Sequence, residues 1–126
     1  MNHKKIIISC LMLLLAVVAK AESVYVYGIA YSPTDSITYL TDIRLLENVK
    51  VQKKTKFLQS RNEYSTQLKQ YMTEQGLDHY VCTVVFKPTY KSLYKDYVKY
   101  KKYLTKRNIV ISTIDQMKFQ FRAITE

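Results

Sequence analysis

Residues 89–107 carry the most strongly patterned segment of the chain, with two chemically different faces at helical spacing. Stepping ~100° per residue gathers one apolar and aromatic set: Tyr90, Leu93, Tyr94, Tyr97, Tyr100 and Leu104. The opposite side, within an arc of roughly 80°, carries Lys91, Lys95, Lys99, Lys102 and Lys106. The pattern predicts a long amphipathic helix that packs its aromatic face against other elements and turns its lysines outwards.

Two strands are expected before that helix. Residues 24–31 are apolar, β-branched and aromatic with little alternation, which predicts a strand that is covered on both faces. Ser32-Pro33-Thr34-Asp35 supplies turn chemistry. Residues 37–45 then alternate, which predicts a half-buried strand that forms a hairpin with the first. The expected buried side is Ile37, Tyr39, Thr41, Ile43 and Leu45.

A shorter helix is expected over residues 60–76. Ser60-Arg61-Asn62-Glu63 has the spacing of a capping box. Gly76 is placed to end the helix in a left-handed conformation. The apolar residues between them recur at helical spacing: Tyr64, Leu68, Tyr71 and Met72.

The remaining elements complete an α+β pattern. Residues 80–86 and 109–111 read as strands, and alternation over Met117–Phe121 suggests a further amphipathic strand at the end of the chain. The order β-β-α-β-α-β predicts a two-layer sandwich, with a mostly antiparallel sheet and two helices on one face.

The N-terminus has the three parts of a secretory signal. Met1–Lys5 is positive, Ile6–Ala19 is apolar except for Ser9, and Ala19-Lys20-Ala21 is a small-x-small cleavage signal. The apolar run is shorter than the ~20 residues of a spanning helix. We therefore expect cleavage after Ala21 and export of residues 22–126 as one small basic domain, periplasmic or extracellular; an uncleaved anchor is the alternative.

The charge of this domain favours an anionic partner. The whole chain has a net charge of +10. Removing Lys4, Lys5 and Lys20 leaves 17 of the 20 basic residues against all 10 acidic ones, a net charge of +7. The partner would be an anionic polymer, a lipid headgroup or an acidic protein surface, bound by Lys91, Lys95, Lys99, Lys102 and Lys106. A merely solvated face is the alternative, although such a face usually mixes Glu with Lys, and here Asp96 is the only acid in the segment.

Several kinds of chemistry are poorly supported by the residues. After cleavage Cys82 is the only cysteine and His79 the only histidine, which is too few for a typical zinc site. Cys82 is expected to be a small core residue. Two glycines cannot build a glycine-rich phosphate loop. We therefore expect no cofactor and no metal. Most of the 12 tyrosines fall on predicted buried faces, and Tyr103 is the better candidate for an exposed contact.

One family resemblance is present. Tyr25-Val26-Tyr27-Gly28-Ile29, a turn, and Thr38-Tyr39-Leu40-Thr41 resemble the opening hairpin of the GIY-YIG nuclease family. Arg61 opens the next helix, and Leu93-Tyr94-Lys95-Asp96-Tyr97 follows the third strand. The resemblance implies a secreted nuclease that uses Mg²⁺, with a site made of Tyr27, Tyr39, Arg61 and Asp96.

Three functions are thus open from the sequence. The leading hypothesis is a small exported, non-catalytic binding or structural module that meets an anionic partner through its lysines. The alternative is the metal-dependent nuclease, in a complete or a degenerate form. The third is a subunit that adds the Met117–Phe121 segment as an edge strand to a partner.

Overall fold

The computed structural model describes residues 22–49 and 61–124, which form an α+β fold. Its elements are β1 (Glu22–Tyr31), β2 (Ile37–Thr41), β3 (Arg44–Val49), α2 (Arg61–Glu74), β4 (Val81–Lys87), α3 (Tyr90–Lys106) and β5 (Val110–Ile114). The predicted order is confirmed, with the second strand divided into β2 and β3. The predicted signal with its cleavage site at Ala21, and the capping residue Ser60, lie outside the described residues.

β1 is the centre of the sheet. β4 runs antiparallel along one of its edges, from the pair Tyr25 and Lys87 to the pair Tyr31 and Val81. β2 and β3 follow one another, both antiparallel, along the other edge. β5 is parallel to β2 and ends the sheet on that side. The sheet is therefore mostly antiparallel, as predicted, with one parallel pair.

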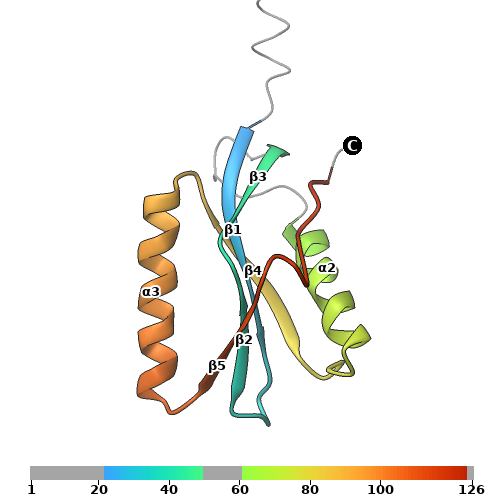
Figure 1. Cartoon of the computed structure of the whole chain (residues 1–126), viewed down its shortest axis with the longest axis vertical. Helices are drawn as coiled ribbons and strands as arrows, with labels where there is room; N and C mark the ends of the chain where they lie inside the picture. Colours follow the sequence, from blue (N-terminus) through green and yellow to red (C-terminus); the bar gives the residue numbers. More distant parts are fainter. Residues whose placement is uncertain (1–21, 50–60, 125–126) are drawn as a thin grey trace, which may run out of the picture.

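The two helices lie on opposite faces of this sheet, with α3 on one side and α2 on the other (Figure 1). Side chains alternate along β1, so that Val24 and Val26 join the core under α2, while Tyr27 and Ile29 join the core under α3. The expectation that both helices share one face is wrong, and the molecule has three layers. The physical reason is the unbroken apolar run of β1, which needs cover on both faces.

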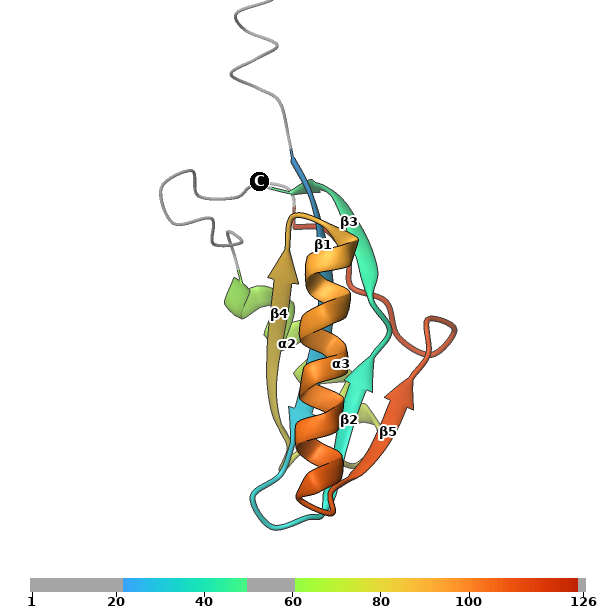
Figure 2. The same ribbon diagram turned by 90° about the vertical axis from the view of Figure 1, so that its left-hand side faces the viewer.

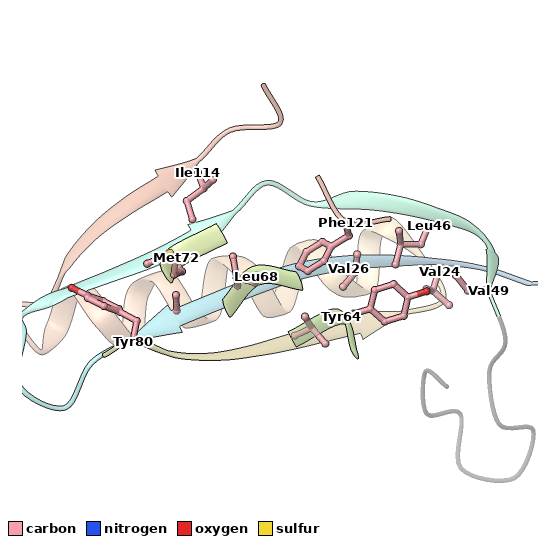
Figure 3. Close-up of a cluster of buried hydrophobic side chains, with 12 residues drawn as sticks. Val24, Val26, Leu46, Val49, Tyr64, Leu68, Met72, Tyr80, Ile114 and Phe121 are labelled. Carbon is pink, nitrogen blue, oxygen red and sulfur yellow. The ribbon is translucent and has the colours of Figure 1, made fainter. Parts of the chain in front are cut away.

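The core under α2 is built around a glycine of β1. Tyr64, Leu68 and Met72 point from α2 towards the sheet (Figure 3). A Cβ atom at Gly28 would lie 2.7 Å from Leu68 Cδ2 and 2.9 Å from Phe121 Cζ. The missing side chain lets the helix and the C-terminal segment approach the sheet closely. Full burial of Leu68 alone contributes about 1.5–3 kcal/mol.

The second strand is interrupted by a bulge. Ile29 pairs with Leu40, but Val26 pairs with Arg44, so β2–β3 has one more residue than β1 over this stretch. The extra residue reverses the phase of the alternation. Leu40 faces α3 and Leu46 faces α2, although both are even-numbered.

The expected buried set is wrong on both sides of the bulge. In β2 the fully buried residues include Thr38 and Leu40 from the opposite face, while Ile37 and Tyr39 are only partly buried. In β3, Leu45 is 46% exposed.

The C-terminal segment after β5 is not a strand. Residues 115–118 form a turn in which Asp115 Oδ1 accepts from the Met117 amide at 2.7 Å. Phe121 is then buried in the core under α2, and the Gln67 side chain makes two hydrogen bonds with the backbone of Arg122. The predicted strand over Met117–Phe121 is wrong, because its phenylalanines cover the sheet of their own chain. This segment is not a free edge for a partner.

Local chemistry defines the ends of the helices, and the left-handed glycine after α2 was predicted. α2 is followed by Gly76 at φ +80°. Thr89 caps α3 by accepting from the Ser92 amide at 3.2 Å. Asn108 at φ 60° turns the chain into β5. The predicted boundaries of residues 89–107 are confirmed to within a residue.

Candidate functional site

The outer face of α3 is a row of exposed lysines. The helix lies on the outside of the sheet and runs lengthwise along its strands (Figure 2). All five predicted lysines are exposed: Lys91, Lys95, Lys99, Lys102 and Lys106. Fifteen residues of helix place the first and last about 22 Å apart. Within residues 22–49 and 61–124 the only ion pair joins His79 and Asp35, so none of these lysines has a carboxylate partner there. We call these five residues the lysine face.

Tyrosines border the lysine face. Tyr90 and Tyr94 are each 50% exposed and stack with ring centroids 5.9 Å apart. The expectation that both lie on the buried side is wrong. The centre of the buried stripe is set by Leu93, Tyr97 and Leu104, and Tyr94 lies roughly 90° around the helix from it. A shallow groove of about 280 Å³ runs beside Tyr94, with Val98 and three lysines as its other walls.

The single acid of α3 is turned away from the lysine face. Asp96 Oδ1 accepts a hydrogen bond from the Tyr27 hydroxyl at 2.6 Å. Tyr27 is fully buried, and its ring meets Tyr97 edge to face at 4.9 Å. Burial, followed by the bond to the Asp96 carboxylate, raises the pKa of Tyr27 far above its usual range. Tyr27 is thus a permanent donor that fixes Asp96 and keeps its charge off the lysine face.

The structure divides the four residues of the nuclease resemblance between two faces of the sheet. Tyr27 and Asp96 meet under α3. Tyr39 packs with Tyr80 at 5.3 Å, next to the core under α2. Arg61 opens α2 and donates to the Val84 carbonyl at 2.9 Å. These four side chains do not share a cleft, so they do not form a joint nuclease site.

Metal-binding groups are equally dispersed. In the part of the chain that the structure describes, no three His, Cys, Asp or Glu side chains lie together in a way that could hold an ion. Nothing in the described residues therefore supplies a set of ligands for the Mg²⁺ that the resemblance implies.

A second recess, of about 610 Å³, lies beside the C-terminal half of α3 and the turn between β1 and β2. We call it the α3 cavity. Its walls include Tyr31, Thr38, Asp96, Tyr100, Tyr103 and Arg107. Of these, Tyr103 is the predicted exposed contact, and it is 48% exposed. The cavity as a whole was missed, because its walls come from segments about 60 residues apart in the chain.

A polar cluster ties the β1–β2 turn to the start of β4. Asp35 Oδ2 lies 2.8 Å from His79 Nε2 and accepts from the Tyr80 hydroxyl at 3.0 Å. The hydrogen bonds of His79 and then of Tyr80 lower the pKa of Asp35. Burial and then Asp35 raise the pKa of Tyr80 to about 12. His79 is thus engaged with Asp35 rather than with a nucleophile.

Cys82 is half-buried against the core under α2. Burial raises the pKa of its thiol, and this effect is larger than the opposite effect of the nearby Lys69 charge. A reactive cysteine needs the opposite shift. Cys82 is therefore a packing residue, as expected.

Comparison with known proteins adds no family. No protein-family model, no curated protein and no solved structure matches this chain. Among the helices that the structure describes, none has the length and apolar character needed to cross a membrane. The function is therefore argued from charge, shape and side-chain chemistry.

Proposed function

We propose that the chain is an exported, non-catalytic binding or structural module that contacts an anionic partner through the lysine face. The observation that carries the proposal is the row of five exposed lysines without a carboxylate partner in the described residues. Export is proposed from the N-terminal pattern that ends at Ala21. The partner would be an anionic polymer, a lipid headgroup layer or an acidic protein surface.

The rigidity of α3 supports this proposal. Leu93, Tyr97 and Leu104 anchor the helix to the sheet, and Thr89 caps its first turn. The spacing of the lysine Cα atoms is thereby fixed before binding, which lowers the entropic cost of association. On a surface of mixed charge, glutamates would neutralise such a row of lysines. The only acid of α3 is Asp96, and its carboxylate is bound by the Tyr27 hydroxyl instead.

The size of each contact sets the expected affinity. An exposed ion pair contributes about 0.2–1 kcal/mol and is screened by salt. Five such contacts give about 1–5 kcal/mol, which corresponds to a Kd of about 0.2 mM or weaker, so the interaction through the lysines alone should be weak and strongly dependent on ionic strength. The tyrosines beside the lysines, Tyr90 and Tyr94, add apolar contact.

The test is salt-dependent binding to three probes: a heparin oligosaccharide, a single-stranded oligodeoxynucleotide and phosphatidylglycerol vesicles. We expect at least one probe to bind, with affinity falling at least tenfold between roughly 0.05 and 0.5 M NaCl. The double variant Lys91→Glu/Lys95→Glu should weaken that binding at least tenfold. Acidic residues in the first turns of a helix favour its dipole, so this variant should still fold.

A charge-matched control separates the lysine face from net charge. Lys118→Glu/Arg122→Glu changes the total charge equally and alters exposed positions away from α3. We expect it to change affinity less than about twofold, since distant exposed charges are screened. The proposal fails if no probe binds in a salt-sensitive way, or if the two double variants weaken binding equally.

A further inference from the structure

The α3 cavity is assembled from two parts of the chain. Tyr31 and Thr38 flank the β1–β2 turn, whereas Asp96, Tyr100 and Tyr103 belong to α3. Its volume of about 610 Å³ lies within the range of ≈ 300–1,000 Å³ that small-molecule sites occupy. The recess is thus large enough for a ligand of one or two rings.

The Thr38 hydroxyl on its wall has no partner among the described residues and is open to solvent. Thr38 is only 3% exposed and lines the cavity. Its backbone is paired with Tyr31 on one side and Ile111 on the other, but among the described residues its hydroxyl makes no hydrogen bond. In the described part of the chain no buried side-chain nitrogen or oxygen lacks a hydrogen-bond partner, so this unbonded hydroxyl is reached by solvent. An unpaired hydroxyl that faces a recess is therefore available to a ligand.

Asp96 offers acceptor capacity at the same place. Its Oδ1 is taken by Tyr27, and within the described part of the chain its Oδ2 has no hydrogen-bond partner. A carboxylate has about four lone-pair sites, so Asp96 retains room for incoming hydroxyl donors. Tyr27 holds the carboxylate in place, which prepares it for a ligand before binding.

The aromatic wall is one-sided. The rings of Tyr100 and Tyr103 are nearly parallel, 14° apart in orientation with centroids 6.0 Å apart, and both project from α3. Arg107 lies over the Tyr103 ring at 4.2 Å and covers part of it. The remaining ring surface forms a platform for the apolar face of a ring, rather than a slot that would grip a flat base from both sides.

The charges of the lining cancel. Lys99 and Arg107 oppose Asp35 and Asp96, so the cavity is neutral although the chain is basic. Donors from the two cations and acceptors from the two carboxylates suit a ligand that has many groups able both to donate and to accept. These donors and acceptors, next to an aromatic platform, fit a ring that carries several hydroxyl groups.

We propose that the α3 cavity binds a neutral saccharide, with an apolar sugar face on Tyr100 and Tyr103 and sugar hydroxyls on Thr38 and Asp96. This site is distinct from the lysine face, with which it shares only Lys99. It goes beyond the anionic partner proposed above and does not depend on it.

The test is an NMR titration of the ¹⁵N-labelled protein with maltotriose, cellotriose and chitotriose, each up to about 10 mM, where weak small-ligand binding is still measurable. We expect at least one saccharide to shift the amides of Thr38, Tyr100 and Tyr103 in a saturable way. The shifts should persist at high salt, because the ligand is uncharged. That property separates this result from binding at the lysine face.

Two variants and a matched control make the test specific. Tyr103→Ala and Thr38→Val should each weaken binding at least fivefold, and Thr38→Val should change the melting temperature little because the hydroxyl that it removes makes no hydrogen bond to the described residues. Tyr94→Ala removes an equally exposed tyrosine of α3 outside the cavity and should change affinity less than twofold.

Three results would overturn the proposal. The first is the absence of saturable shifts at the cavity with all three saccharides. The second is a saturable response of the cavity amides to adenosine, titrated in parallel, that none of the saccharides gives, which would assign the platform to a base. The third is equal weakening by Tyr94→Ala and Tyr103→Ala.

Discussion

Tyr27 shows how one buried residue sets the chemistry of two surfaces. Its hydroxyl holds Asp96 under α3. The outer face of the helix is consequently all positive, and the α3 cavity receives a fixed carboxylate. The same residue was singled out in the sequence for a different reason, as a member of a tyrosine-rich hairpin, and its bond to Asp96 could not be read from their separation of 69 positions.

We predict that Tyr27→Phe destabilises the protein by about 1.5–3 kcal/mol, the size of a hydrogen bond to a charged group. The ring still fills the core, so the loss comes from the hydroxyl. Urea unfolding measures the difference.

The matched control is Tyr97→Phe. Tyr97 packs against Tyr27 and is 9% exposed, but its hydroxyl makes no hydrogen bond to any residue of 22–49 or 61–124. Its removal should change the free energy of unfolding by less than about 0.5 kcal/mol, as for a change away from such features. Equal losses in the two variants would show that the bond to Asp96 is not what stabilises this core.

At the scale of the elements, the bulge between β2 and β3 decides which side chains of this strand enter each core. It lets Leu40 face α3 and Leu46 face α2, so that one strand serves both cores. At the bulge the Thr41 side chain satisfies backbone groups. Its Oγ1 accepts a hydrogen bond from the Gly28 amide at 2.7 Å and donates one to the Asp42 carbonyl at 3.1 Å. Thr41 is 2% exposed, so water cannot substitute for it.

We predict that Thr41→Val destabilises the protein by about 1–3 kcal/mol, the cost of an unsatisfied buried amide. Thr41→Ser keeps the acceptor and should be clearly less destabilising than Thr41→Val. Thermal unfolding of the two variants measures the order. If Ser is as damaging as Val, then the methyl group and not the hydroxyl stabilises the bulge.

The elements themselves were readable from the sequence because their signals are local. Periodicity placed α3 to within a residue, and Gly76 marked the end of α2. The bulge was not readable, since it depends on how Asp42 and Ile43 meet β1 across the sheet. The choice of face for each helix was also missed, because it follows from the path of the chain between strands and not from either helix pattern. Met117–Phe121 alternates like a strand, yet it has no neighbouring strand to pair with.

Of the two candidate surfaces, one could be predicted from the sequence and the other could not. The lysine face was predicted residue by residue, since helical spacing alone defines it. The α3 cavity needs Thr38 and Tyr103 to meet across 65 positions of sequence, and only the three-layer packing brings them together.

At the scale of the whole molecule, tyrosines fill both cores and make the fold sensitive to alkali. Burial raises the pKa of Tyr97 and of Tyr100, and that of Tyr27 is raised further by Asp96. The pKa of Tyr80 is raised to about 12. A phenol with a higher pKa in the folded state keeps its proton where the unfolded chain, at about pH 10, has lost it. Its contribution to stability is complete below about pH 10 and is lost as the pH rises above that value.

We therefore predict that the free energy of unfolding falls steeply between about pH 9 and pH 12. Urea unfolding at about pH 8 and pH 11 measures the fall, and absorbance at about 295 nm follows tyrosinate formation. Tyr80→Phe removes a phenol with a raised pKa from a site that is 1% exposed. The free energy of unfolding of this variant should therefore fall less between the two pH values than that of the wild type. At pH 8 the variant should be less stable than the wild type, because it lacks the hydrogen bond to Asp35. Tyr94→Phe, at an exposed position, should retain the full fall. If Tyr80→Phe and Tyr94→Phe lose the same stability over this interval, then proton binding by buried tyrosines does not set the alkaline limit of the fold.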